Sequence, residues 1–82
     1  MSDPVQKPVH YNQGSVECIV AIKAAMEREE FIGYLRGNAI KYLWRYRMKG
    51  KPIQDLDKAI WYIEYLRDEL ILSAIADAMH EP

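Results

Sequence analysis

The segment Phe31–Met48, FIGYLRGNAIKYLWRYRM, decides the fold that the sequence predicts. Its apolar side chains recur at steps of three and four residues, which is the spacing of one helix face. This face comprises Phe31, Leu35, Ala39, Tyr42, Leu43 and Tyr46. Gly33 and Gly37 each weaken a helix by up to about 1 kcal/mol relative to alanine. We therefore expect a kink, or a close approach by another backbone or a ligand, near Gly37.

The sequence after this segment predicts a turn and then a long third helix. Gly50 and Pro52 form a helix stop. The third helix is expected to start near Asp55, which can cap it, and to run towards Met79 over about 35 Å. One apolar stripe of this helix is Leu56, Ile60, Ile63, Leu66 and Leu70; the other is Trp61, Tyr65, Leu72, Ile75 and Met79.

A short helical hairpin cannot cover both stripes. We therefore expect a homo-oligomer in which another copy of the chain buries the second stripe, or the end of the helix beyond Leu70. The contact residues are predicted to be Trp61, Tyr65, Leu72 and Ile75. The alternative is that the end of the third helix frays or folds back on its own chain.

Residues 1–14 carry Pro4, Pro8 and Gly14 without periodicity, which predicts an extended N-terminal arm. Ser15 is typical of a helix N-cap, with Glu17 in the positive first turn. A first helix is expected to run from there to about Arg28. The predicted fold class is thus all-α, with an arm at 1–14 and one small three-helix domain at 15–82.

Composition indicates a cytoplasmic protein. The chain has 82 residues, no apolar run near the roughly 18 residues of a membrane span, and a polar, proline-bearing N-terminus that predicts no signal peptide. Its single cysteine, Cys18, forms no internal disulfide and fits a reducing compartment. The apolar neighbours of Cys18 predict a buried thiol.

Positive charge is concentrated in the middle of a chain whose net charge is −1. Seven of the eleven Lys and Arg residues, but only two of the twelve acids, fall between Arg36 and Lys58. Such an asymmetry indicates an anionic partner, although basic residues on a helix are most often a solvated face.

The spacing of polar residues predicts where such a partner binds. Asn38, Lys41 and Arg45 share one helix face, Lys49 lies one turn further on, and Lys58 and Tyr62 form a pair on the third helix. Ammonium and guanidinium groups suit phosphate oxygens, and aromatic rings suit a stacked base. The arm can add ligand contacts. The candidate nucleotide- or phosphate-binding residues are His10, Tyr11, Asn38, Lys41, Trp44, Arg45, Lys49, Lys58 and Tyr62.

Other site classes have weaker support. There is no Gly-rich phosphate loop of the standard NTPase type, no zinc spacing among the histidines and cysteine, and no pattern for binding double-stranded DNA. Glu27 and Glu30, with Glu64 and Asp68, loosely resemble the magnesium ligands of all-α nucleotide pyrophosphohydrolases, but Gly33 stands where a third glutamate is required. We expect no metal and no cofactor.

Three blocks resemble a known family: PVHYNQGSVECI (8–19), FIGYLRGNAIKYLWRYRMKGK (31–51) and DLDKAIWYI (55–63). They are similar to the SaV-like family of small, mostly phage-encoded proteins of unknown function. The same module resembles part of a larger nucleotide kinase of lytic coliphages, which phosphorylates deoxynucleoside monophosphates without a Walker loop or an obligatory divalent metal.

The resemblance implies a role with nucleotides in the host cytoplasm. It implies that Lys41, Arg45 and Lys58 neutralise phosphates, with His10, Tyr11 and Asn38 as orienting groups. This chain is far shorter than the kinase, and Val20 stands where the family pattern often has an acid.

Two hypotheses follow, and a third is kept beside them. The chain is a nucleotide kinase or phosphotransferase assembled at a subunit interface, with catalytic residues unknown. Alternatively, it sequesters a nucleotide without turnover, as a phage sponge for a host defence signal does. The third hypothesis is a protein-interaction subunit whose basic face meets an acidic partner.

Overall fold

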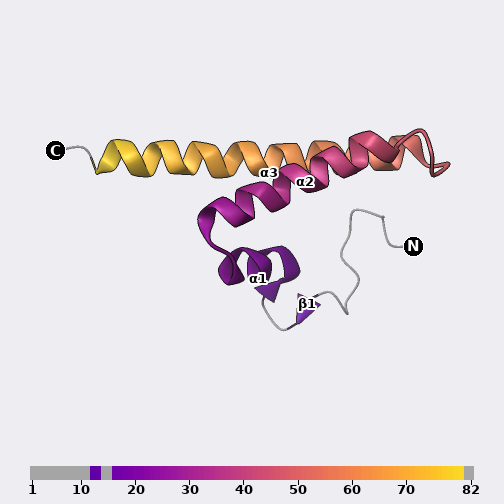
Figure 1. The fold of residues 1–82 in the computed structure, drawn as a ribbon. Helices are drawn as coiled ribbons and strands as arrows, with labels where there is room; N and C mark the ends of the chain where they lie inside the picture. Colours follow the sequence, from indigo (N-terminus) through magenta and orange to yellow (C-terminus); the bar gives the residue numbers. More distant parts are fainter. Residues whose placement is uncertain (1–11, 14–15, 81–82) are drawn as a thin grey trace. The chain divides into compact units, whose positions relative to one another are not determined.

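The computed structural model describes residues 12–13 and 16–80, with side-chain burial from Glu17 onward (Figure 1). Its elements are the strands β1 (Asn12–Gln13) and β2 (Val16–Glu17) and the helices α1 (Cys18–Ala25), α2 (Arg28–Arg45) and α3 (Pro52–Met79). The predicted all-α class with three helices is confirmed. The chain divides into two compact units, Met1–Phe31 and Ile32–Pro82.

The first unit combines a minimal strand pair with a short helix. β1 and β2 are antiparallel, with Asn12 opposite Glu17. Glu17 occupies the N-cap position of α1 and makes no side-chain cap hydrogen bond, so the prediction of Glu17 inside the first turn is wrong by one position. The predicted cap Ser15, most of the arm and the boundary at 14–15 lie outside the described residues.

The prediction of a buried thiol at Cys18 is wrong. Cys18 is the first residue of α1, and its side chain is exposed. In α1, the buried side chain belongs to the next residue, Ile19. Apolar neighbours in the sequence did not imply burial of Cys18, because successive residues of a helix point to different sides.

α2 begins three residues before the predicted Phe31, and its start is capped by its own third residue. The Oε1 atom of Glu30 accepts a hydrogen bond of 2.8 Å from the backbone N–H of Glu27. This is the return half of a capping box, which satisfies one of the donors left unpaired at a helix N-terminus. The helix then continues without interruption through Gly33 and Gly37.

The connection between α2 and α3 contains Gly50 and Pro52 as predicted, but α2 ends at Arg45, three residues before the predicted Met48. The backbone N–H of Met48 bonds to the carbonyl of Arg45 at 2.9 Å, and Gly50 follows with φ of 77°. Residues with a Cβ seldom adopt this left-handed conformation. Pro52 is the first residue of α3, where its missing N–H costs nothing.

In the second unit, α2 and α3 form a hairpin with a small core (Figure 1). Leu35, Ala39 and Ala59 are buried, with at most 5% of their surface exposed. Leu43, which the sequence places in the same stripe, is 46% exposed, so that part of the predicted core is wrong. Beyond these core residues, aromatic and charged side chains make the contact between α2 and α3.

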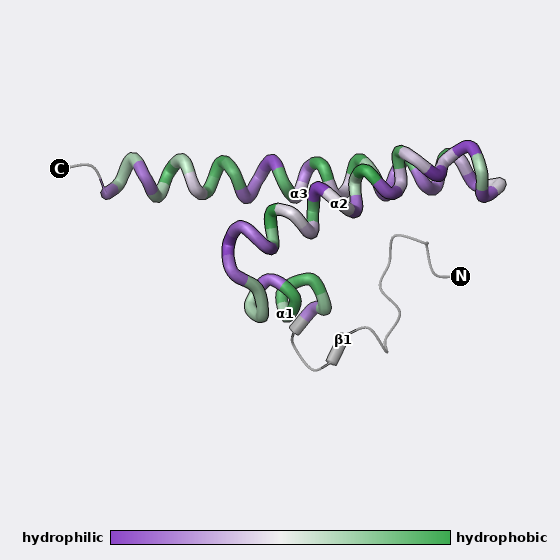
Figure 2. Tube along the Cα trace, in the orientation of Figure 1, coloured by the Kyte–Doolittle hydropathy of each residue, from purple (hydrophilic) through white to green (hydrophobic). Residues whose placement is uncertain are grey.

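Neither predicted stripe of α3 supplies a fully buried side chain, although Leu56, Tyr65 and Leu66 are half-buried. The two buried polar side chains of α3 are Asp55 and Glu69, and the buried alanine between them is Ala59. The exposed large apolar side chains of α3 are Ile53, Ile60, Trp61, Ile63, Leu70, Ile71, Leu72, Ile75 and Met79. Hydrophobic residues recur along the whole length of α3 (Figure 2). No helix among the described residues is long and apolar enough to cross a membrane.

Candidate functional site

Three cationic side chains from two helices surround the ring of Tyr42. The Nζ atom of Lys41 lies 4.5 Å from the ring centroid, and the Nζ atom of Lys58 lies 5.4 Å from it. The guanidinium carbon of Arg45 lies 4.8 Å from the same centroid. These are cation–π distances, at which the ring attracts each positive group. We call Lys41, Tyr42, Arg45, Lys58 and Tyr62 the cation–tyrosine cluster.

Local sequence explains how the cluster forms. Lys41, Tyr42 and Arg45 lie within about one turn of α2, so their side chains leave the helix on neighbouring sides. The turn at Gly50 reverses the chain and brings the first turns of α3, with Lys58 and Tyr62, beside the last turns of α2. The predicted convergence of Lys41, Arg45 and Lys58 is therefore present in the hairpin.

Stacked tyrosines hold the aromatic side of the cluster. The rings of Tyr42 and Tyr62 lie 5.9 Å apart with an interplanar angle of 14°. Tyr34 meets Tyr62 edge-on at 6.3 Å, and Trp61 meets it edge-on at 4.9 Å. Such contacts add roughly 0.5–1.5 kcal/mol each beyond area burial, so they fix the ring that the cations surround.

The three cations do not carry equal free charge. Arg45 donates to Asp55 from Nε at 3.3 Å and from Nη2 at 3.2 Å, and the Asp55 side chain is 2% exposed. Asp55 therefore balances Arg45. No ion pair within the described part of the chain involves Lys41 or Lys58, so these two lysines give the cluster its excess positive charge.

The two lysine nitrogens lie close enough to act together. Both distances end on one ring centroid, so the nitrogens are within about 10 Å of each other, which is one Debye length at about 0.1 M salt. Two like charges at this separation repel. A bound anion would relieve that repulsion and gain attraction to both.

The other predicted site residues lie in varied positions. Asn38 is half-buried and donates from Nδ2 to the carbonyl of Tyr34 at 2.9 Å, so one of its two N–H donors is occupied within α2. Trp44 is 76% exposed. Lys49 is exposed in the turn after α2. His10 and Tyr11 lie outside the described residues.

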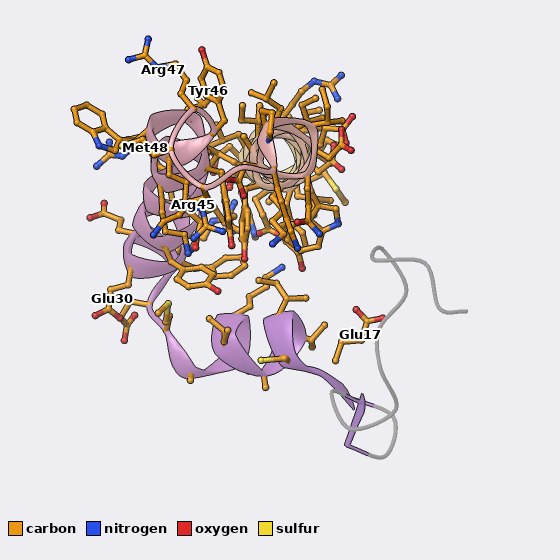
Figure 3. All side chains as sticks on the ribbon, turned by 90° about the vertical axis from the view of Figure 1, so that its right-hand side faces the viewer. Glu17, Glu30, Arg45, Tyr46, Arg47 and Met48 are labelled. Atoms are coloured by element: carbon orange, nitrogen blue, oxygen red, sulfur yellow. The ribbon has the colours of Figure 1, made fainter. Side chains whose placement is uncertain are left out.

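Near the end of α2, Arg47 and Tyr46 project away from the hairpin, unlike Arg45 (Figure 3).

Tyr42 and Asp55 were not among the predicted site residues. Tyr42 was placed on the apolar face of the second helix and also counted among the aromatic surfaces for a base. The prediction that Asp55 caps the third helix is wrong, because α3 begins at Pro52 after an N-cap at Lys51. The pairing of Asp55 with Arg45 could have been predicted from the sequence, because Asp55 follows Arg45 by ten residues across a helix stop. In the described part of the chain, no group of three or more His, Cys, Asp or Glu side chains is placed so that it could hold a metal ion.

A family model described as proteins of unknown function (DUF3310) matches residues 5–64. The chain belongs to this family. The DUF3310 match contains every residue of the cation–tyrosine cluster and ends within α3. No curated protein and no solved structure matches the chain.

Proposed function

We propose that this DUF3310 chain binds a phosphate-bearing small molecule, of the nucleotide class, at the cation–tyrosine cluster. The observation that carries the proposal is the convergence of Lys41, Arg45 and Lys58 on the Tyr42 ring, within 4.5–5.4 Å. Two helices contribute, so the cationic group exists only when the hairpin is folded.

The three cations of the cluster and the neighbouring Trp44 have distinct parts in this proposal. Lys41 and Lys58 supply positive charge that no described carboxylate neutralises. Arg45 keeps N–H donors beyond the two bonded to Asp55, because a guanidinium has five. Trp44, at 76% exposure, is the aromatic surface nearest in sequence on which a base can stack.

Binding with turnover is one form of the proposal, and the sequence resemblance favours it. A phosphoryl group would pass from a nucleoside triphosphate to a phosphate oxygen of a deoxynucleoside monophosphate. One P–O bond to the acceptor forms, the bond to the β-phosphate oxygen of the donor breaks, and two diphosphates result. Lys41 and Lys58 would stabilise the negative charge on the transferred group.

Binding without turnover is the second form. A sequestering protein needs the same cations but no second phosphate site, and it returns its nucleotide unchanged. In the cluster, the positive groups gather around a single tyrosine ring, which matches the need for one phosphate site. The two forms differ in the fate of the nucleotide, which can be measured directly.

The test is equilibrium binding of purified protein to deoxynucleoside monophosphates and nucleoside triphosphates, followed by chromatography of the nucleotides. Lys41→Ala and Lys58→Ala should each weaken binding about tenfold or more, because each removes a charge-assisted contact. Lys51→Ala, an exposed lysine away from the cluster, is the matched control and should change binding less than twofold.

Conversion of a monophosphate and a triphosphate into two diphosphates would establish the kinase form. Recovery of unchanged nucleotide from a tight complex would establish the sequestering form. Equal binding by wild type and by the Lys41→Ala, Lys58→Ala double variant would overturn the site, and no binding of any nucleotide would overturn the function.

A further inference from the structure

The side of α2 opposite the hairpin core is apolar and basic. Ile40, Leu43 and Trp44 are 55%, 46% and 76% exposed, and Arg36 and Arg47 are exposed at its two ends. At 100° per residue, Ile40 and Trp44 lie opposite Leu35 and Tyr42, while Arg36, Leu43 and Arg47 lie roughly 80–140° around the helix from them. We define the outer α2 face as Gly33, Arg36, Gly37, Ile40, Leu43, Trp44 and Arg47.

The side of α3 opposite the hairpin core is apolar and acidic. Ile60, Leu72 and Ile75 are each more than half exposed, and Trp61 is 40% exposed. The charged residues among them are all carboxylates. We define the outer α3 face as Asp57, Ile60, Trp61, Glu64, Asp68, Ile71, Leu72 and Ile75.

The charges on the two faces have matching spacing. Eleven residues separate Arg36 from Arg47, and eleven separate Asp57 from Asp68. Eleven residues are about three helical turns, or some 16 Å, so Asp57 and Asp68 return to the same side of α3, while Arg47 lies two residues past the end of α2, about three turns on from Arg36. Arg47 lies in the turn that directly continues α2.

These charges are available for an external partner. No ion pair with another described residue involves Arg36, Arg47 or Asp57. Asp68 meets only its neighbour Arg67, at 3.7 Å, in a pair whose side chains are about two-thirds exposed. Such a surface pair contributes little to stability, so Asp68 can exchange its partner.

Gly33 and Gly37 allow a helix to come close to the outer α2 face. A Cβ atom added at either glycine would meet nothing within 4 Å. The distance between packed helices depends on the side chains at the contact, and glycine permits the shortest approach. Another helix can therefore approach α2 closely near Gly37, on the side that carries Ile40 and Trp44.

We propose that the outer α2 face of one copy of the chain packs on the outer α3 face of a second copy. Arg36 and Arg47 then meet the carboxylates of the second copy, and the exposed apolar side chains between them are buried together. A second copy is the occupant because the chain itself carries both a basic face and an acidic face of equal charge spacing. The two faces belong to opposite sides of one hairpin, so a single copy cannot pair them.

This contact is heterologous, because it joins two different surfaces. Each copy therefore offers one free face of each kind, and the assembly closes as a ring or continues as a filament. The contact uses neither Lys41 nor Lys58, so it leaves the proposed phosphate-binding cations free. It does cover Trp44, the proposed stacking surface for a base, and in that respect it overlaps the proposed nucleotide site.

Charge reversal on each face gives the test, read as mass by light scattering. The wild type should exceed the 9.6 kDa of one chain. Arg36→Glu with Arg47→Glu should lower the mass, and so should Asp57→Lys with Asp68→Lys, because like charges then face each other. The matched control, Lys49→Glu with Lys51→Glu, changes the charge equally outside the faces and should keep the wild-type mass.

Mixing supplies the decisive measurement. The two charge-reversed chains, each defective alone, should assemble together, and a chain carrying all four reversals should assemble by itself. Circular dichroism confirms that each variant remains helical. A wild type with the mass of one chain would overturn the proposal, as would full assembly of the Arg36→Glu, Arg47→Glu variant. Failure of the mixture to assemble would overturn the heterologous pairing.

Discussion

Arg45 and Asp55 form a two-pronged pair across the hairpin: Nε donates to Oδ2 at 3.3 Å and Nη2 donates to Oδ1 at 3.2 Å. The carboxylate is buried, and the guanidinium side chain is one-third exposed. The pair joins the last residue of α2 to the first turn of α3. It therefore both holds the hairpin and orients one cation of the cluster.

Removal of Arg45 should destabilise the fold. Arg45→Ala leaves a buried carboxylate without its cation, which should lower the free energy of unfolding by roughly 2–3 kcal/mol. Replacing both members, as Arg45→Met with Asp55→Leu, should restore most of that loss. Urea unfolding followed by circular dichroism measures both. A loss under about 0.5 kcal/mol for Arg45→Ala would contradict the structural role of the pair.

Alanine at two glycines should have opposite effects. Gly50→Ala places a Cβ in the left-handed region, at φ of 77°, and should lower the free energy of unfolding by about 1–2 kcal/mol. Gly37→Ala lies in a continuous helix with open space for its Cβ, so it should raise the free energy by up to about 1 kcal/mol. Thermal melts of the two variants, at concentrations where the chain is not assembled, measure both changes. Changes of the same sign in the free energy of unfolding would contradict the prediction.

Leu35 should matter far more than Leu43. Leu35 is fully buried, so Leu35→Ala should cost about 2–5 kcal/mol through lost burial and the cavity that remains. Leu43 is 46% exposed, and Leu43→Ala should cost under about 1 kcal/mol in the unassembled chain. Chemical denaturation of the two variants side by side tests the assignment, and equal losses would show that Leu43 belongs to the core.

The ring of Tyr42 should matter more for nucleotide binding than its hydroxyl. Tyr42→Phe keeps the π-face that attracts Lys41 and Lys58, so binding should change less than threefold. Tyr42→Leu removes the face, and binding should weaken about fivefold, which corresponds to roughly 1 kcal/mol. Titration calorimetry with a bound nucleotide separates the two, and circular dichroism serves as the folding control. Equal binding by both variants would exclude the ring as the organiser of the cations.

Periodicity predicted the helices well, since Phe31, Leu35 and Ala39 are buried and Gly50 ends the hairpin turn as expected. It did not predict which side of each helix faces the other. Two apolar stripes on α3 compete for that role, and the hairpin is closed instead by Asp55, Ala59 and the tyrosines. Apolar periodicity takes no account of ion pairs or ring stacking, so it cannot predict a helix–helix interface that is built from them.

The candidate site was predicted in part for a related reason. Helical spacing placed Lys41 and Arg45 together, and the hairpin added Lys58. Spacing could not predict that Asp55 would neutralise Arg45, because that contact depends on the register between two helices. It also could not distinguish a core tyrosine from one whose ring the cations surround.

The ten-residue separation between Arg45 and Asp55 has a kinetic consequence. Closing so short a stretch of chain requires little loss of entropy, and helical proteins dominated by nearby contacts reach their native state in microseconds to milliseconds. The hairpin is therefore complete long before two chains meet at ordinary concentrations. Dilution would slow the joining of copies without slowing the appearance of each copy's helical signal.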